Sequence, residues 1–464
     1  MSLNRTASAD HVLTEWPELP LSELIEPLAS GSRPKGGVRG IEDGVPSVGG
    51  EHITAHGGFD FTRVKYVPHK FYESMRRGHI LPGDILIVKD GATTAKVALV
   101  RDDFPFSEAV VNEHVFILRP KANHDSRYIF WYLHSNEGQE RILEHFQGAA
   151  QGGINQRFAP GTHVPVPPTL EIEASLADQI ETLVNQMKSP ADRLATVPTL
   201  LKKFRQCVLT AACSGQITID WREANKPSES AEQLLHRIHV ERKLKSVPKP
   251  VTDENTPEYW SRARIGEICA VATGATPLRT RPAYYGGSIP WITSSAVNDG
   301  IVTQASEFIT DMAVKETNAK VFAPGTLIVA MYGEGQTRGR VAELGIATAT
   351  NQALAALLFQ GANQECKAFL KLHFLKNYEE MRTMAAGGVQ PNLSLGLIRD
   401  SEILLPPLDE QLEIVRRVES LFVLADSIES RLVQATSSVE RTTQAILAKA
   451  FRGELMEAAD ELTS

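Results

Sequence analysis

The chain has 464 residues, of which 42% are hydrophobic and 22% are charged, a composition typical of a globular protein with room for roughly two to four domains. Its formal net charge of −8 argues against a protein that coats nucleic acid through a general excess of lysine and arginine. The sequence has no apolar run of about 18 residues or more and no secretory signal pattern, so we expect a cytoplasmic protein that does not enter a membrane.

The first 165 residues are rich in glycine, proline and short apolar runs of the kind found in β-strands. Two such runs, residues 85–88 and 97–100, flank a polar loop, which predicts a strand, a loop and a second strand. Apolar side chains recur at spacings of three and four over residues 126–146, and this pattern predicts helix. We predict that residues 1–165 form a compact α+β domain.

Residues 166–216 are predicted to form a long helix. They begin with a Pro-Pro pair at 167–168, and apolar residues then alternate spacings of four and three from Leu176 to Val208, as in the seam of a coiled coil. Pro190 and Pro198 interrupt this pattern, so we expect a kinked or broken helix.

Residues 217–258 form a connector that contains a predicted helix from Ala231 to Lys245. We favour a solvated helix followed by a linker. The alternative is a helix that docks at a specific place on the protein.

The remainder of the chain repeats the part before the connector, so that residues 16–216 and 260–454 share one plan. Residues 81–88 return as 323–330, and Gly152-Gly153 return as Gly387-Gly388. Because solenoid repeats are only about 20–50 residues long, this period indicates a duplicated domain with an appended helix. We assign residues 259–404 to the second α+β domain and residues 405–464 to the second helix and a C-terminal tail.

The second helix carries the more regular seam, which runs from Ile414 to Ile446 without glycine or proline between 408 and 452. Matching seams predict that the two helices pair as a coiled coil, and the pattern allows either a parallel or an antiparallel pair. The alternative is that each helix lies on its own domain. At about 1.5 Å per residue the seam would span roughly 48 Å, so a paired coil would act as a spacer between the two domains.

The sequence contains no recognisable catalytic motif. It lacks Gly-x-Gly-x-x-Gly, a Walker loop and His-Glu-x-x-His. His52 and His56 have a spacing typical of metal ligands, but the second copy has Ala296 and Gly300 in their places. The four cysteines form no Cys-x-x-Cys pair and are predicted to be reduced. We predict no catalytic residue, no metal site and no bound cofactor in this chain.

Two α+β domains, each followed by a coiled-coil helix, resemble the specificity subunit of type I restriction-modification enzymes. Residues 82–87 (Pro-Gly-Asp-Ile-Leu-Ile) resemble a strand of the family's target recognition domains, and residues 405–411 (Leu-Pro-Pro-Leu-Asp-Glu-Gln) resemble the start of its helix. The most specific match is residues 444–455, which resemble the end of that helix. The first copy departs from the pattern, since it lacks Glu-Gln after residues 167–168 and has Ala-Cys-Ser-Gly at 212–215.

This resemblance implies a non-catalytic subunit that reads a bipartite target in double-stranded DNA, one half with each target recognition domain, across an unread spacer. It also implies that the two helices are antiparallel. The expected partners are two DNA adenine methyltransferase (modification) subunits, which hold S-adenosylmethionine, and motor-nuclease (restriction) subunits, which use ATP and Mg. Two rival interpretations are a stand-alone DNA-modifying enzyme and a coiled-coil scaffold whose α+β domains bind protein or sugar.

Loops in which the two copies differ are the expected DNA contacts, because each domain must read a different sequence. Arginine can bridge guanine, glutamine or asparagine can pair with adenine, and lysine or threonine suits either a base or a phosphate. In the first copy we predict contacts from Arg33, Lys35 and Arg39, from Lys89, Thr93, Thr94 and Lys96, and from Gln151, Asn155, Gln156 and Arg157. In the second copy we predict contacts from Arg279, Arg281, Tyr284 and Tyr285, from Tyr332, Gln336, Thr337, Arg338 and Arg340, and from Gln390 and Asn392.

Overall fold

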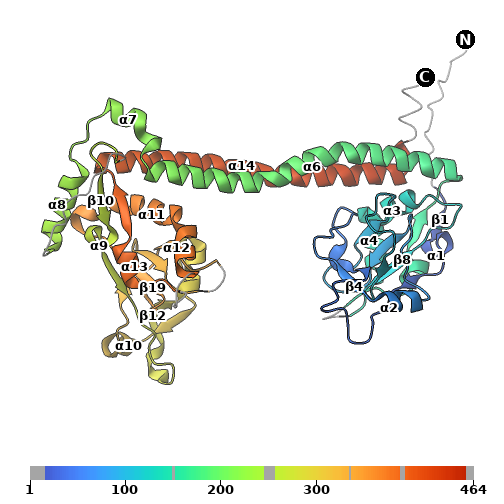
Figure 1. Cartoon of the computed structure of the whole chain (residues 1–464), viewed down its shortest axis with the longest axis horizontal. Coiled ribbons are helices and arrows are strands. Elements are labelled where there is room, and N and C mark those ends of the chain that lie inside the picture. Colours follow the sequence, from blue (N-terminus) through green and yellow to red (C-terminus); the bar gives the residue numbers. More distant parts are fainter. Residues whose placement is uncertain (1–15, 149–151, 245–255, 334–335, 387–391, 456–464) are drawn as a thin grey trace, which may run out of the picture. The chain divides into compact units, whose positions relative to one another are not determined.

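The computed structural model describes residues 16–148, 152–333, 336–386 and 392–455, except for 245–255 (Figure 1). The chain divides into two compact units. Unit 1 contains residues 1–195 and 432–464, and unit 2 contains residues 196–431. Each unit therefore combines one α+β domain with a part of each of two long helices, α6 (Leu170–Cys213) and α14 (Leu408–Phe451).

Unit 1 is built on two small sheets and a two-stranded ribbon. The four-stranded sheet has the order β2 (Ala29–Ser30), β8 (Val115–Leu118), β5 (Ile85–Val88) and β6 (Val97–Leu99). The three-stranded sheet has the order β4 (Lys65–Val67), β3 (Val45–Val48) and β7 (Val110–Val111), and β1 (Glu18–Pro20) pairs with β9 (His163–Pro165). The short helices are α1 (Leu21–Leu24), α2 (His69–Ser74), α3 (Ser126–His134), α4 (Asn136–Leu143) and α5 (Phe158–Gly161), with a 3₁₀ turn η1 (Gly50–His52).

Strand β5 lies at the centre of unit 1 and is buried on both faces. Ile85 and Ile87 pack in one core cluster with α3, whereas Leu86 and Val88 pack in a second cluster with β3. This alternation is what the two-residue period of a strand requires. β5 pairs with β6 in an antiparallel register, which confirms the predicted strand, loop and strand.

Unit 2 repeats this topology with one additional strand in each of the two larger sheets. Its five-stranded sheet has the order β11 (Ala270–Thr273), β19 (Leu354–Leu358), β16 (Leu327–Ala330), β17 (Val341–Leu344) and β13 (Ile301–Val302). Its four-stranded sheet has the order β14 (Glu307–Ile309), β12 (Tyr285–Ile292), β18 (Thr348–Thr350) and β15 (Val321–Phe322), and β10 (Ser261–Arg264) pairs with β20 (Glu402–Leu405). The helices are α7 (Ile219–Ala224), α8 (Ala231–Arg242), α9 (Ile265–Ile268), α10 (Asp311–Glu316), α11 (Cys366–Lys376), α12 (Tyr378–Ala386) and α13 (Leu395–Asp400), with 3₁₀ turns η2 (Gln216–Thr218), η3 (Pro282–Tyr284), η4 (Ser294–Asp299) and η5 (Gly361–Asn363).

The predicted helix over 126–146 consists of two helices, α3 and α4, because Ser135 begins a new one. The Ser135 hydroxyl accepts a hydrogen bond from the Gly138 amide at 3.1 Å, which caps the start of α4. The second copy is also divided at this point, into α11 and α12, with Asn377 at the end of α11.

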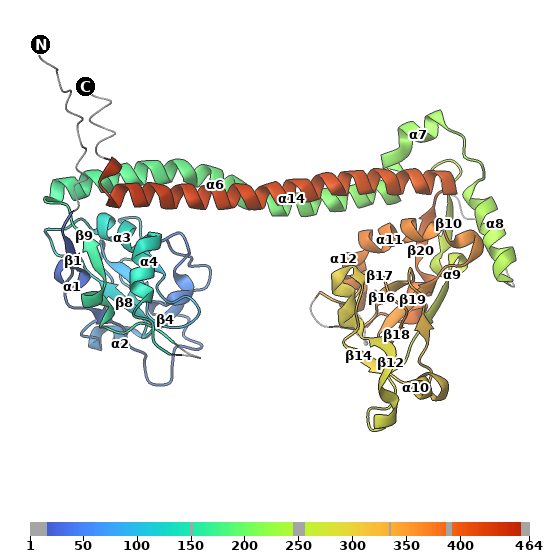
Figure 2. The ribbon, with the colours of Figure 1, turned by 180° about the vertical axis from the view of Figure 1, so that it is seen from behind.

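The long helices pack together in each unit, and there they run in opposite directions (Figures 1 and 2). In unit 1, residues near the start of α6, Leu176 and Ile180, share a core cluster with Leu447 and Phe451 near the end of α14. In unit 2 the ends are reversed: residues 208–212 near the end of α6 share a cluster with residues 414–418 near the start of α14. The predicted pairing of the two helices is confirmed.

Helix α6 is continuous through both of its prolines, so of the two expected outcomes, a kink or a break, the break is excluded. Pro190 and Pro198 are exposed. Each removes one hydrogen-bond donor from the helix, and at an exposed position water can satisfy the carbonyl that is left without a partner.

The connector is docked in unit 2, so the favoured interpretation of a solvated helix was also wrong. Leu234, Leu235 and Ile238 of α8 are buried in the same core cluster as Ile265 and Ile268 of α9. Arg242 donates hydrogen bonds to the carbonyls of residues 266 and 267, at 2.9 and 2.8 Å.

Candidate nucleic-acid interface

In unit 1 a tight loop of residues 89–96 joins β5 to β6. Ala95 has a left-handed backbone with φ of 72°, and its amide donates to the Val88 carbonyl at 2.8 Å. The Thr94 hydroxyl donates to the Gly91 carbonyl at 2.7 Å. These bonds hold the half-buried side chains of Lys89, Thr93, Thr94 and Lys96 on a defined turn.

The structure brings a second predicted group to this loop. The Ile154 amide donates to the Lys89 carbonyl at 2.7 Å, and the Gly91 amide donates to the Gly152 carbonyl at 3.4 Å. The exposed residues Asn155, Gln156 and Arg157 follow directly in the chain. Gln151 lies outside the described residues.

The third predicted group of unit 1 is linked to the same loop through charged side chains. Arg33 pairs with Glu113 at 3.6 Å, Glu113 lies 3.6 Å from His114, and His114 Nδ1 lies 2.5 Å from Asp90 Oδ1. Lys35 and Arg39 are exposed near Arg33 in the chain. Sequence reasoning missed Asp90, Glu113 and His114, since acidic residues are not the expected signal for a DNA-facing loop.

The corresponding loop in unit 2, residues 331–340, joins β16 to β17 and is longer. Gly339 holds the place of Ala95, with φ of 83°, and its amide donates to the Ala330 carbonyl at 2.8 Å. Arg340 donates to the side-chain oxygen of Gln336 at 3.0 Å. Tyr332 is exposed, and Thr337 is half-buried.

Arg338 is the unusual residue of this loop. Its Nε and Nη1 atoms are shielded from solvent and have no hydrogen-bond partner among the described residues. Leaving a cationic group buried without an acceptor is costly, so these atoms need an acceptor either from residues outside the described ranges or from a bound molecule.

Residues near 390 meet the loop of unit 2 as those near 152 meet the loop of unit 1. The Leu393 amide donates to the Met331 carbonyl at 3.1 Å, which brings the exposed Asn392 to this edge. Gln390 lies outside the described residues.

The remaining predicted group of unit 2 is engaged within the protein. Arg279 pairs with Glu307 at 2.5 Å and stacks over the ring of Tyr285 at 4.7 Å, and this arginine lowers the pKa of Glu307. Arg281 pairs with Glu316 at 2.8 Å and stacks over the ring of Tyr284 at 4.5 Å. Tyr284 is only 5% exposed, so its ring packs in the core.

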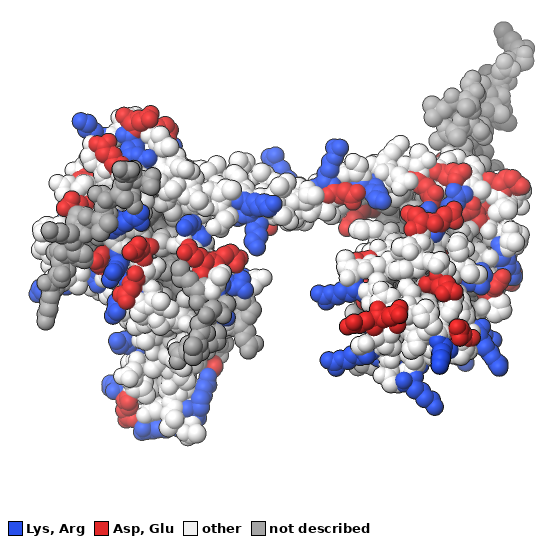
Figure 3. Space-filling model, in the orientation of Figure 1, with Lys and Arg blue, Asp and Glu red and all other residues white. Residues whose placement is uncertain are grey.

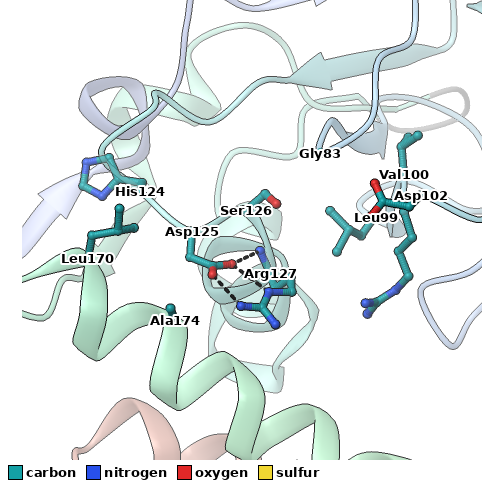
Figure 4. A pocket seen from close by; sticks show the side chains of 11 residues that line it. Gly83, Leu99, Val100, Asp102, His124, Asp125, Ser126, Arg127, Leu170 and Ala174 are labelled. Atoms are coloured by element: carbon teal, nitrogen blue, oxygen red, sulfur yellow. Dashed lines mark hydrogen bonds and ion pairs between the residues drawn. The ribbon is translucent and has the colours of Figure 1, made fainter.

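Charge is unevenly distributed on unit 1. In Figure 3 several Lys and Arg side chains lie along its edge away from α6, whereas Asp and Glu gather where the domain meets that helix. A cavity of about 470 Å³ lies at this acidic junction (Figure 4). There Arg127 pairs with Asp125 at 2.7 Å and with Asp178 at 2.5 Å, and His124 contacts Glu173 at 2.9 Å. Because these charges satisfy one another, the cavity is best explained as a joint between the domain and α6.

The structure gives no indication of a metal centre at the described residues, where no group of three or more His, Cys, Asp or Glu side chains could hold an ion. His52 is buried and bonded at both ring nitrogens, to the Gly49 amide and the Arg63 carbonyl, each at 2.9 Å. Among the described helices, none is both long and apolar enough to cross a membrane.

Comparison with known proteins agrees with this arrangement. The pattern of the type I restriction modification DNA specificity domain matches residues 257–435. The EcoKI specificity subunit of Escherichia coli K12 is 27% identical over 427 residues, covering 89% of this chain and 83% of that protein. The StySPI specificity subunit of Salmonella potsdam is 26% identical over 430 residues, with the same coverage.

Two solved structures share the fold. A chain from a study of complex assembly and conformational transition in the type I restriction-modification system has a TM-score of 0.67 at 19% identity, covering 95% of this chain and 98% of its own. The HsdS subunit from Thermoanaerobacter tengcongensis has a TM-score of 0.51 at 18% identity, covering 95% and 97%. With the duplicated domains and paired helices described above, these similarities show that the chain belongs to the DNA specificity subunits of type I restriction-modification systems, the non-catalytic part of those complexes.

Proposed function

We propose that the subunit reads a bipartite target in double-stranded DNA, one half with each unit. The observation that carries this proposal is that the loops of residues 89–96 and 331–340 occupy equivalent places in the two units. Both loops join equivalent strands and share a left-handed residue bonded to the end of the first strand. Their side chains differ in number and chemistry, which is what two readers of different sequences need.

The loop chemistry favours different contacts in the two halves. In unit 1, Lys89, Lys96 and Arg157 suit phosphates, while Thr93, Thr94, Asn155 and Gln156 suit base edges. In unit 2, Arg338 and Arg340 suit guanine, and Gln336 suits adenine. Arg338 has no acceptor for its Nε and Nη1 atoms among the described residues, and guanine O6 and N7 would supply acceptors if this shielded side chain turned outward on binding DNA.

We also propose that two methyltransferase subunits bind the duplicated framework, since two similar surfaces can receive two identical partners. These subunits would hold S-adenosylmethionine and flip the target adenine from the duplex, a step for which the described residues of this chain offer no recognised site. Restriction subunits using ATP and Mg would complete a complex that cleaves unmodified DNA.

The test is to express the chain with the modification subunits of its own organism and to map methylated adenines in the host DNA. We expect two short specified sequences separated by a gap of fixed length. A contiguous motif would contradict the bipartite proposal. As a control, the purified chain alone should transfer no methyl group from labelled S-adenosylmethionine to DNA.

A further inference from the structure

In unit 1 the loop of residues 89–96 is supported by one side chain from α4. The Gln139 amide nitrogen donates to the Ala95 carbonyl at 3.0 Å and to the Leu133 carbonyl at 2.6 Å. Leu133 lies in the last turn of α3, and the Ser135 cap sets the first turn of α4, where Gln139 stands. Gln139 therefore ties the loop to the junction of two helices.

In unit 2 the loop of residues 331–340 is supported from α12, which occupies the same place after the sheet. The hydroxyl of Tyr378, the first residue of α12, donates to the Gln336 carbonyl at 2.5 Å. Gly339 packs against the same residue, since a Cβ there would lie 3.4 Å from the Tyr378 carbonyl oxygen. The Arg382 guanidinium covers the Tyr378 ring at 5.5 Å, which restricts the ring.

We propose that Gln139 and Tyr378 are positioning residues for DNA readout, each acting on the loop of its own unit. The two side chains differ in chemistry, yet both start from the first turn of the second helix and donate to a backbone carbonyl of the loop. This inference rests on the proposed function and adds to it the residues that fix the direction of the readers.

Arg338 shows why the direction matters. It lies two residues beyond Gln336, and its Nε and Nη1 atoms have no acceptor among the described residues. A bidentate contact to guanine needs the guanidinium within a narrow range of positions, so freeing the Gln336 carbonyl should weaken discrimination more than general affinity.

The experiment uses the full chain in complex with its modification subunits and the DNA motif established for the unaltered complex. Tyr378→Phe removes only the hydroxyl, and Gln139→Met keeps the side-chain length without a donor. Methylation rates are compared on duplexes with one base changed in either half. Glu380→Gln and Glu140→Gln, exposed on the same two helices, are the matched controls.

We expect Tyr378→Phe to reduce discrimination about 3- to 10-fold at positions read by unit 2, with no change in the half read by unit 1. Gln139→Met should show the reverse pattern. Both controls should match the unaltered complex.

A merely structural role would weaken methylation of every duplex equally and lower the unfolding midpoint, and that result would overturn the inference. Unchanged discrimination in both variants would overturn it too. If the unaltered complex shows no bipartite preference, the proposed function itself fails, so the two failures are distinguishable.

Discussion

The two units bind the start of a long helix to the rest of the unit through different side chains. Each buries a glutamate in the first turn of a long helix, Glu173 in unit 1 and Glu410 in unit 2. Glu173 accepts hydrogen bonds from the Asp125 amide at 2.8 Å and lies 2.9 Å from His124. Glu410 accepts from the side chains of Thr218, Arg222 and Trp260, at 2.7, 2.6 and 2.7 Å.

The difference shows how a duplicated fold diverges. In unit 2 the connector supplies Thr218 and Arg222, so the helix start, the connector and Trp260, the residue just before β10, meet at one carboxylate. In unit 1 the domain alone supplies the partners. The two copies therefore share a backbone plan, but different segments of the chain supply the side chains and amides that bind the buried glutamate.

The largest expected effect concerns the buried carboxylate of Glu410 and the three side chains that bind it. Glu410→Ala would leave the guanidinium of Arg222 buried without its partner, and we expect a loss of about 3–5 kcal/mol in the free energy of unfolding. Denaturant titration of the purified chain measures it. The control is Glu171→Ala, which changes the exposed residue at the equivalent place after the Pro-Pro pair and should leave the transition unmoved. If both substitutions lowered the free energy of unfolding equally, the contacts of Glu410 with Thr218 and Arg222 of the connector would not explain the loss.

Acid sensitivity is the next comparison, since burial lowers the pKa of one histidine in unit 1, His134, and of two in unit 2, His239 and His373. Burial lowers the pKa of His134 in unit 1 and of His373 in unit 2 to about 4. A lowered pKa means that the unfolded chain takes up the proton first. The stability that each neutral, buried histidine contributes is therefore complete above pH 6.5 and is lost as the pH falls from 6.5 toward 4.

We expect His134 and His373 each to contribute up to about 3 kcal/mol over this pH range. His373→Phe should remove the contribution of His373 and leave those of His134 and His239, seen as a shallower dependence of unfolding free energy on pH. The exposed His236→Gln is the control and should keep the original slope. An unchanged slope in His373→Phe would mean that His373 takes up its proton in the folded protein.

The third comparison separates recognition of particular bases from sequence-independent binding to DNA. Arg338→Ala should cost about 1–3 kcal/mol and relax one base position in the half read by unit 2, if Arg338 contacts guanine. Lys96→Ala in unit 1 should instead weaken binding to all sequences and reduce the salt dependence by about one charge. Binding to a set of single-base variants at two salt concentrations measures both. An unaltered motif and affinity in Arg338→Ala would remove that residue from the reading surface.

The sequence predicts the parts of the fold that are periodic. The strands around residues 85–100 and the long helices follow from local patterns of two and of three to four residues. Docking of α8 could not be predicted, because Leu234 and Ile238 share a core cluster with Phe369 of α11, which lies far along the chain. The candidate loops were found because they differ between copies. Gln139 and Tyr378 were missed because their contacts depend on where a helix lies relative to a loop.

The smallest expected effect concerns the left-handed residue of each loop, which is Ala95 in unit 1 and Gly339 in unit 2. A left-handed backbone costs a residue with a Cβ about 1–2 kcal/mol, and a glycine avoids this strain. Gly339→Ala should therefore destabilise the chain, but by only about 1 kcal/mol, since alanine also restricts the unfolded chain.

Ala95→Gly should change stability very little. The relief of strain is offset by the greater freedom of glycine in the unfolded chain and by loss of a methyl group that is fully buried, worth about 0.8 kcal/mol. The free energies of unfolding of both variants and of the double exchange provide the check. If Gly339→Ala were stabilising, strain would not explain why the copies differ here, and the alanine of unit 1 would be the better choice for both loops.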